Sequence, residues 1–363
     1  MRIALVAPLV TPIAEPQVGG AQAFVADLAR GLTGRGHHVD VYAASGSAIN
    51  DANVIDLDID SRTLTPALYR AAGDTPAGDE VTEPALATVY ARVRQIPYDI
   101  VHNHGFDPPA VRLATVLDCP VVHTLHLPPT RGMVGALRDA EAGSNPPTVV
   151  TVSESCARAW RALVPVDVVL RSHVPTGRIP WSEEPGEGVV FAGRLSPEKG
   201  VVQAIQIARE ASLHIDVYGD PYDPLYARTA IDPWRRRRGV AIHKALPRAD
   251  LWERIRRARV VLCPAMWDEP FGMLAAEAQA CGTPVVASPR GGLPENIEDG
   301  VSGFLVDPTD IAGAANAVRR AGTLSRASCR RHAEVDLDIE SSLDAHEGMY
   351  QTMLIEPDKR AYA

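Results

Sequence analysis

Short apolar runs alternate with longer amphipathic stretches along most of the chain. Seven apolar runs in the first half have the length of strands, at residues 2–7, 37–43, 53–57, 99–102, 120–125, 148–152 and 166–170. Six more follow, at residues 188–193, 213–219, 239–243, 259–265, 284–288 and 302–307. Between the runs, apolar residues recur at helical spacing, as at residues 21–36, 82–96, 196–211, 249–258 and 271–282. This alternation predicts parallel sheets with helices on both faces.

The alternation is interrupted once, by a stretch rich in Pro, Gly and charged residues at 171–188. That composition is typical of a linker, so we predict an α/β fold of two doubly wound, Rossmann-like domains, residues 1–172 and 187–335. Residues 336–363 form a third part, where an amphipathic pattern over 340–355 favours a helix that packs back on the first domain. Ligands of doubly wound sheets bind beyond the carboxyl ends of the strands, which predicts a ligand cleft between the domains.

Composition narrows the class of protein. A chain of 363 residues with 46% apolar residues and a net charge of −9 is expected to be globular and not to bind nucleic acid. No apolar run approaches the length of a membrane span, no signal-peptide pattern is present, and the first 170 residues lack a basic face, so membrane association is not expected. Five scattered cysteines fit a reducing cytoplasm better than a disulfide or zinc framework. The oligomeric state stays open.

Two glutamates eight positions apart raise the first question about function. Glu269 and Glu277 flank a Pro-Phe-Gly step, and the local sequence offers neither a metal cluster nor an arginine to pair with them. Buried carboxylates need partners, so the predicted partner is a ligand. Asp268 or Glu269 is expected to cap a helix with Pro270 in its first position.

That predicted helix has the features of an anion site. Gly272 would open its N-terminus to a diphosphate, and Glu277 would follow roughly 7.5 Å further along the axis, where a carboxylate can accept from a ribose diol. The alternative is a capped helix with a solvated Glu277.

Cations follow the first strand of the second domain. Arg194 and Lys199, in "GRLSPEKG", emerge at a strand end, where guanidinium and ammonium groups suit a diphosphate. The alternative for Lys199 is a solvated lysine in the first turn of a helix, a place that the helix dipole disfavours. A Gly291–Gly292 loop lets the backbone approach a ligand, or is an ordinary turn.

These segments together resemble the retaining glycosyltransferases of the GT-B fold, family 4 (glycosyl transferases group 1). The segments "EPFGMLAAE", "GRLSPEKG" and "EAQACGTPVVASPRGGLPENIEDGVSGFLVDP" carry the likeness, together with "PQVGGAQ", "YDIVHNHG" and "VVHTLHLPP". The resemblance implies catalytic roles for His126, Arg194, Lys199 and Glu269. It implies donor contacts from Gly19, Gly20, Arg194, Lys199, Glu269, Phe271, Gly272, Met273, Leu274 and Glu277. The acceptor is expected to meet His104, Ser153 and Glu154, the latter two in "VSES". A structural role for His102 and His123 stays as open as a functional one.

The implied enzyme is a hexosyltransferase-type transferase (EC 2.4) with no cofactor and no metal site. It would move a sugar from a nucleotide-diphosphate donor to a hydroxyl of a small soluble acceptor: a sugar, an aminocyclitol or a natural-product aglycone. Residues 241–247, "AIHKALP", lack a glycine that the family carries, so UDP, GDP and dTDP all stay open. A sugar-nucleotide epimerase of the same fold and a non-catalytic sugar-nucleotide binder are the alternatives. A dinucleotide-dependent oxidoreductase is disfavoured, because "VGGAQ" is no G-x-G-x-x-G turn.

Overall fold

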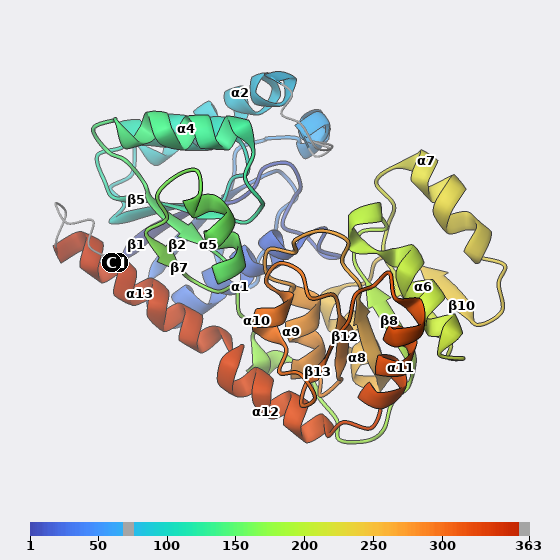
Figure 1. The fold of residues 1–363 in the computed structure, drawn as a ribbon. Coiled ribbons are helices and arrows are strands. Elements are labelled where there is room, and N and C mark those ends of the chain that lie inside the picture. Colours follow the sequence, from blue (N-terminus) through green and yellow to red (C-terminus); the bar gives the residue numbers. More distant parts are fainter. Residues whose placement is uncertain (68–75, 356–363) are drawn as a thin grey trace. The chain divides into compact units, whose positions relative to one another are not determined.

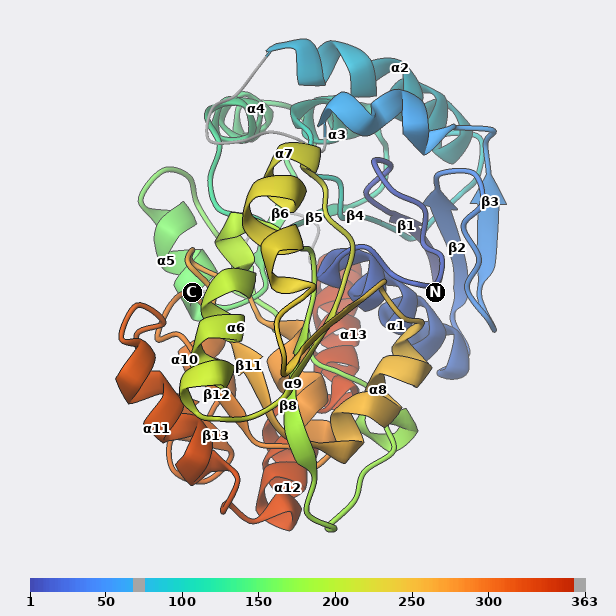
Figure 2. The same ribbon diagram turned by 90° about the vertical axis from the view of Figure 1, so that its right-hand side faces the viewer.

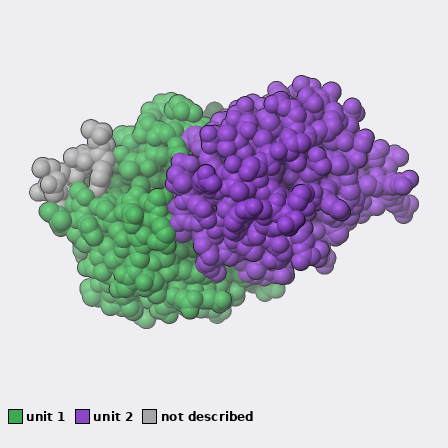
Figure 3. Space-filling view, turned by 90° about the horizontal axis from the view of Figure 1, so that it is seen from below, with its two compact units in different colours: residues 1–14, 21–172, 340–363 green, residues 15–20, 173–339 purple. Residues whose placement is uncertain are grey.

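The chain folds into two compact units, each built on one parallel sheet. The structure is a computed structural model that describes residues 1–67 and 76–355. Unit 1 comprises residues 1–14, 21–172 and 340–363, and unit 2 comprises residues 15–20 and 173–339 (Figure 3). Residues 356–363 of the predicted C-terminal part lie outside the described residues. Unit 2 includes residues 15–20, which the sequence pattern assigns to the N-terminal domain.

Unit 1 contains a seven-stranded sheet in the order β3-β2-β1-β4-β5-β6-β7, with every pairing parallel. The strands are β1 (Arg2–Val6), β2 (His38–Ala43), β3 (Asn53–Asp56), β4 (Ile100–Asn103), β5 (Val121–Leu125), β6 (Thr148–Thr151) and β7 (Val168–Val169). The helices are α1 (Gly20–Gly34), α2 (Pro76–Val93), α3 (Pro108–Arg112), α4 (Arg131–Glu141), α5 (Glu154–Arg161) and α13 (Ile339–Ile355). The views agree that α2 and α4 lie on one side of the sheet and that α1 and α13 lie on the other (Figures 1 and 2). The central strands β4 and β5 are buried along their whole length because both faces are covered.

Unit 2 contains a six-stranded parallel sheet in the order β10-β9-β8-β11-β12-β13. The strands are β8 (Glu187–Ala192), β9 (Ile215–Tyr218), β10 (Val240–His243), β11 (Ala258–Cys263), β12 (Val285–Ala287) and β13 (Gly303–Leu305). The helices are α6 (Val201–Glu210), α7 (Pro224–Tyr226), α8 (Arg248–Arg257), α9 (Met273–Ala280), α10 (Leu293–Asn296), α11 (Ile311–Ala321) and α12 (Arg326–Asp336). Helix α6 packs beside α11, whereas α9 packs beside α8 and α12, so the sheet is covered on both faces. All thirteen predicted strands are present.

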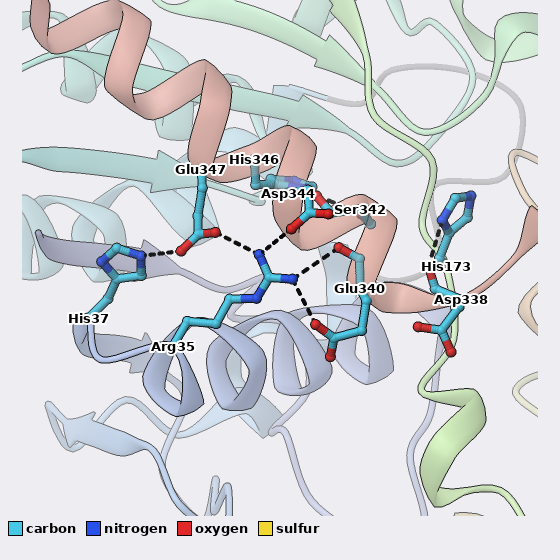
Figure 4. Close-up of polar contacts among 9 residues, drawn as sticks. All are labelled: Arg35, His37, His173, Asp338, Glu340, Ser342, Asp344, His346 and Glu347. Carbon is cyan, nitrogen blue, oxygen red and sulfur yellow. Dashed lines mark hydrogen bonds and ion pairs between the residues drawn. The ribbon is translucent and has the colours of Figure 1, made fainter. Parts of the chain in front are cut away.

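The last long helix, α13, completes unit 1 through contacts with α1. A Cβ atom added at Gly31 of α1 would lie 2.4 Å from Cδ1 of Leu343, so any side chain there would require Leu343 to shift. Beside this contact the Arg35 guanidinium pairs with three carboxylates (Figure 4). They are Glu340 at 2.7 Å, Asp344 at 2.7 Å and Glu347 at 2.6 Å. Within the described residues, no helix is both long and apolar enough to cross a membrane.

The predicted linker is packed rather than loose. The N–H of Val174 donates to the carbonyl oxygen of Leu337 at 2.9 Å, and Nδ1 of His173 lies 3.1 Å from the carbonyl oxygen of Asp338 (Figure 4). Further along, the Arg330 guanidinium donates to the Ile179 carbonyl at 3.1 Å. Residues 173–186 are therefore part of the body of unit 2, in keeping with its boundary at residue 173.

Candidate active site

Glu269, in the loop after β11, is held by a lysine from the segment that follows the neighbouring strand β8. Nζ of Lys199 lies 2.8 Å from Oε1 and 2.7 Å from Oε2 of Glu269. Nε1 of Trp267 donates to Oε2 at 2.8 Å, and the Lys199 ammonium lies 5.3 Å from the centre of the Trp267 ring. The sequence pattern predicted Lys199 and Glu269 as site residues independently of each other. It did not single out Trp267, whose indole N–H fixes the carboxylate.

These contacts keep Glu269 ionised. Burial on its own would raise the pKa of the Glu269 carboxyl. The Lys199 charge, the hydrogen bonds from its ammonium group and the bond from Trp267 outweigh burial and hold the pKa below its usual range. Unit 2 therefore presents a fixed carboxylate and a fixed ammonium group side by side.

Helix α9 begins later than predicted. Gly272 precedes it with φ 95°, a left-handed conformation, and no side chain caps its first turn. The prediction that Asp268 or Glu269 caps this helix, with Pro270 in its first position, is wrong, because the backbone turns at Gly272 and the helix begins at Met273. A Cβ atom at Gly272 would also lie 2.6 Å from Cδ2 of Leu293, so only glycine fits.

Glu277 lies inside α9 with a protein cation as its partner. Both Nε and Nη2 of Arg248, the first residue of α8, approach Oε1 of Glu277, at 2.9 and 2.7 Å. Glu277 is 6% exposed and Arg248 is 7% exposed. The expectation that Glu269 and Glu277 lack a protein partner is thus wrong, as is the alternative of a solvated Glu277, whereas ribose binding by Glu277 stays a prediction. Both contacts from Arg248 converge on Oε1 of Glu277.

The other expected cation, Arg194, lies in the loop after β8. Its Nη2 is 3.3 Å from Oε1 of Glu198, and its guanidinium lies 5.5 Å from the centre of the Tyr222 ring. Lys199 closes a short turn at Pro197–Lys199, and α6 begins only after Gly200, so Lys199 is not in the first turn of that helix as predicted.

Two glycine segments contact the loop that carries Glu269 and the start of α9. A Cβ atom at Gly291 would lie 2.4 Å from the backbone nitrogen of Glu269, so the Gly291–Gly292 loop approaches the protein backbone there. A Cβ atom at Gly20 would lie 3.0 Å from Cγ of Met273. Residues 15–20, which include Gly19 and Gly20, thus lie against the start of α9 within unit 2.

In unit 1, the expected histidines follow β4 and β5. Nδ1 of His104 lies 2.9 Å from Nε2 of His126, and the Phe24 and Phe106 rings each lie 6.1 Å from the His126 ring. His104 is fully buried, whereas His126 is 8% exposed. Burial, with smaller contributions from His123 and His346, lowers the pKa of His126 to about 3. His126 is therefore neutral near pH 7, and His104 occupies its Nε2.

The neighbouring histidines belong to the interior of unit 1. His102 bonds to the Tyr350 hydroxyl at 2.6 Å and to the Thr124 hydroxyl at 2.7 Å. His123 receives a bond from Asn103 at 2.8 Å. Both histidines are buried, and burial lowers the pKa of each. Across residues 1–67 and 76–355, no group of three or more His, Cys, Asp or Glu side chains is arranged to hold a metal ion.

Ser153 and Glu154 stand at the beginning of α5. The Ser153 hydroxyl accepts from the N–H of Cys156 at 3.0 Å and so caps the helix. Glu154 is exposed and lies 3.4 Å from the Arg161 guanidinium. Ser153 is buried, so its local role is structural, whereas the carboxylate of Glu154 lies at the surface.

Two Rossmann-like units, each built on one parallel sheet with helices on both faces, are the architecture of the GT-B glycosyltransferases. Among solved structures, sucrose-phosphate synthase from Thermosynechococcus elongatus superposes with a TM-score of 0.77 at 18% identity, covering 98% of this chain and 100% of that one. The HepE protein of Anabaena, solved with UDP and glucose, gives 0.74 at 21% identity, covering 97% and 100%.

Sequence comparison then gives the family. A family model described as Glycosyltransferase Family 4 matches residues 18–177, and one described as Glycosyl transferases group 1 matches residues 181–334. The chain belongs to this family of glycosyltransferases and is an enzyme of the transferase class. A D-inositol 3-phosphate glycosyltransferase of Xylanimonas cellulosilytica is 29% identical over 362 residues, covering 85% of each chain.

Proposed function

We propose that this protein is a retaining glycosyltransferase that works without a metal ion. It moves a hexose-type sugar from a nucleotide-diphosphate donor to a hydroxyl group of a small soluble acceptor. Unit 2 binds the donor, and unit 1 contributes His126 and the acceptor contacts.

The observation that carries the proposal is the Lys199–Glu269 pair. An ammonium group 2.7 Å from a half-buried carboxylate, which also accepts a hydrogen bond from Trp267, is a preorganised pair of opposite charges beside the N-terminus of α9. In the proposed reaction the Glu269 carboxylate accepts hydrogen bonds from the hydroxyl groups of the donor sugar. The backbone amides of Phe271 to Leu274 donate hydrogen bonds to the same hydroxyl groups. Lys199 and Arg194 stabilise the charge that grows on the leaving diphosphate.

The state of His126 supports retention. Inversion requires a general base within reach of the acceptor hydroxyl, and such a base works best with a pKa near the working pH. A pKa of about 3 makes His126 a weak base, and its Nε2 already faces His104. We therefore assign His126 to positioning the sugar. The leaving diphosphate takes the proton of the acceptor, which attacks the anomeric carbon from the same face.

The comparisons suggest which substrates to try first. The Anabaena HepE structures were solved with UDP and with UDP-glucose, which favours a uridine nucleotide here. Relatives named for D-inositol 3-phosphate favour a phosphorylated polyol as the first acceptor to test, before free sugars, aminocyclitols and natural-product aglycones.

The experiment has two steps. Thermal-shift screening of UDP, GDP and dTDP sugars identifies the donor, and mass spectrometry then follows transfer to an acceptor panel. We expect a product heavier than the acceptor by one sugar, formed only with both substrates present. Isomerised donor without acceptor would identify an epimerase instead. Binding without turnover across the panel would leave a non-catalytic sugar-nucleotide binder.

A further inference from the structure

Helix α8 takes its N-terminal cap from a distant part of the chain. The first amides of a helix need acceptors from outside it, and Pro247, at the cap position, provides no side-chain hydrogen bond. The N–H of Arg248 instead donates to Oε2 of Glu15 at 2.9 Å. A carboxylate is favoured at this end of a helix by the helix dipole. Glu15 thus fastens the start of residues 15–20 to α8.

The side chain of Arg248 makes a second connection. Its Nε and Nη2 hold Oε1 of Glu277, and its guanidinium lies 5.0 Å from the centre of the Trp252 ring. The position of the Glu277 carboxylate therefore depends on Arg248. Backbone and side chain of this one residue act independently, because a substitution at 248 removes the second connection and keeps the first.

The far end of residues 15–20 lies against the same helix that carries Glu277. Gly20 approaches Met273, the first residue of α9, so closely that a Cβ atom there would be 3.0 Å from Cγ. The short segment is thus held at Glu15 by α8 and at Gly20 by α9. The Arg248–Glu277 pair joins those two helices.

We propose that Arg248 is a positioning residue with two separate roles: its side chain places the ribose carboxylate Glu277, and its backbone N–H, bonded to Glu15, fixes the glycine segment 15–20, so that unit 2 itself holds Gly19 and Gly20 at the donor diphosphate. The proposal rests on the proposed function, because it takes a nucleotide-diphosphate sugar as the ligand. Breaking each of the two connections is therefore expected to weaken a different part of nucleotide binding. The Glu15 connection positions the backbone that contacts the diphosphate, and the Arg248 side chain positions the carboxylate that contacts the nucleoside.

Nucleotide titrations separate the two connections. Isothermal titration with UMP and UDP, with the GMP/GDP and dTMP/dTDP pairs in parallel, compares Glu15→Ala with the matched surface variant Glu210→Ala. We expect Glu15→Ala to leave monophosphate affinity within twofold of wild type and to weaken diphosphate affinity by about tenfold. Arg248→Met should weaken both, and Arg248→Lys, which keeps the charge, serves if the Met variant fails to fold. Equal losses of monophosphate and diphosphate affinity in Glu15→Ala would overturn the proposal.

Hydrogen exchange of the nucleotide-free protein tests the connection without any substrate. Amides of residues 17–20 should exchange faster in Glu15→Ala than in wild type or Glu210→Ala. Unchanged exchange would refute the connection. If the exchange result holds but no nucleotide binds the wild-type protein, the proposed function fails and the Glu15 connection stands.

Discussion

Both units bury polar side chains near the carboxyl ends of their strands, but they bury different chemistry. Unit 2 holds charge in pairs, the half-buried Lys199 with Glu269 and the buried Arg248 with Glu277. Unit 1 buries histidines whose pKa values burial lowers, so that they stay neutral. A charged pair can respond to charge that develops on a ligand, whereas a neutral imidazole donates or accepts single hydrogen bonds. The difference locates the electrostatic work of the proposed reaction in unit 2.

Removing the ammonium group from unit 2 is expected to have the largest effect. Lys199→Ala should lower kcat by about 100- to 1000-fold, on the order of 3–4 kcal/mol, with a smaller change in KM, because leaving-group charge peaks in the transition state. Arg194→Ala should act in the same direction. Steady-state kinetics measure both, with Arg236→Ala, an exposed arginine of unit 2, as the control. A rise in KM with a normal kcat would contradict this role.

Removing the Glu277 carboxylate is expected to weaken nucleotide binding. Glu277→Ala is expected to weaken the nucleotide and the nucleotide sugar alike, by about 10- to 100-fold, because charge-assisted hydrogen bonds to the ribose are lost. Titration calorimetry measures both ligands, with Glu298→Ala as an exposed control. The variant removes the Arg248–Glu277 ion pair and is expected to be less stable, so affinities are to be measured well below its melting temperature. Equal affinities in variant and wild type would leave Glu277 a purely structural residue.

Unit 1 is expected to unfold at a higher pH than unit 2 when the protein is acidified. Burial lowers the pKa of His123 and of His126 from 6.5 to about 3. Between pH 6.5 and 3 these histidines are protonated in the unfolded chain but not in the folded chain. The free energy of unfolding therefore falls as the pH drops from 6.5 towards 3. The slope is about 1.4 kcal/mol per pH unit for each such histidine. Pepsin cleavage at about pH 4.5, mapped by mass spectrometry, should begin in unit 1.

A matched pair of variants checks the cause of that acid lability. His123→Asn should flatten the dependence of the urea midpoint on pH between 7 and 5. His214→Asn, at an exposed histidine of unit 2, should leave it unchanged. First cleavage in unit 2 would show that the buried histidines do not set acid stability.

The smallest expected effect is that of chelation. Because Arg194 and Lys199 are proposed to supply the cations for the diphosphate, saturating EDTA should leave the rate of transfer unchanged. Strict dependence on added Mg²⁺ or Mn²⁺ would assign that charge to a metal instead.

The strands could be predicted from the sequence because buried parallel strands are short apolar runs bounded by turn residues. The start of α9 was not, since the left-handed backbone at Gly272 moves the helix past Pro270, which local propensity favours as its first residue.

The hydrogen-bond and ion-pair partners of the site residues could not be predicted from the sequence either. Glu269 meets Lys199 from 70 residues away, and Glu277 meets Arg248 from 29. His102 bonds to Tyr350, 248 residues further along. The position of a residue at a strand end indicates which side chains lie near one another, but contacts between segments far apart in the sequence determine which of them pair.

The configuration of the glycosidic product tests the central claim most directly. If unit 2 supplies the charge and unit 1 supplies no base, the acceptor attacks from the face that the diphosphate leaves, and an α-linked donor gives an α-linked product. The anomeric coupling constant in the NMR spectrum of the purified product reports this. His126→Ala should slow the reaction and still give the α anomer, with the basic limb of the pH profile unchanged. A β-linked product from an α-linked donor would contradict the account, since inversion requires a base that the neutral histidines of unit 1 are proposed not to provide.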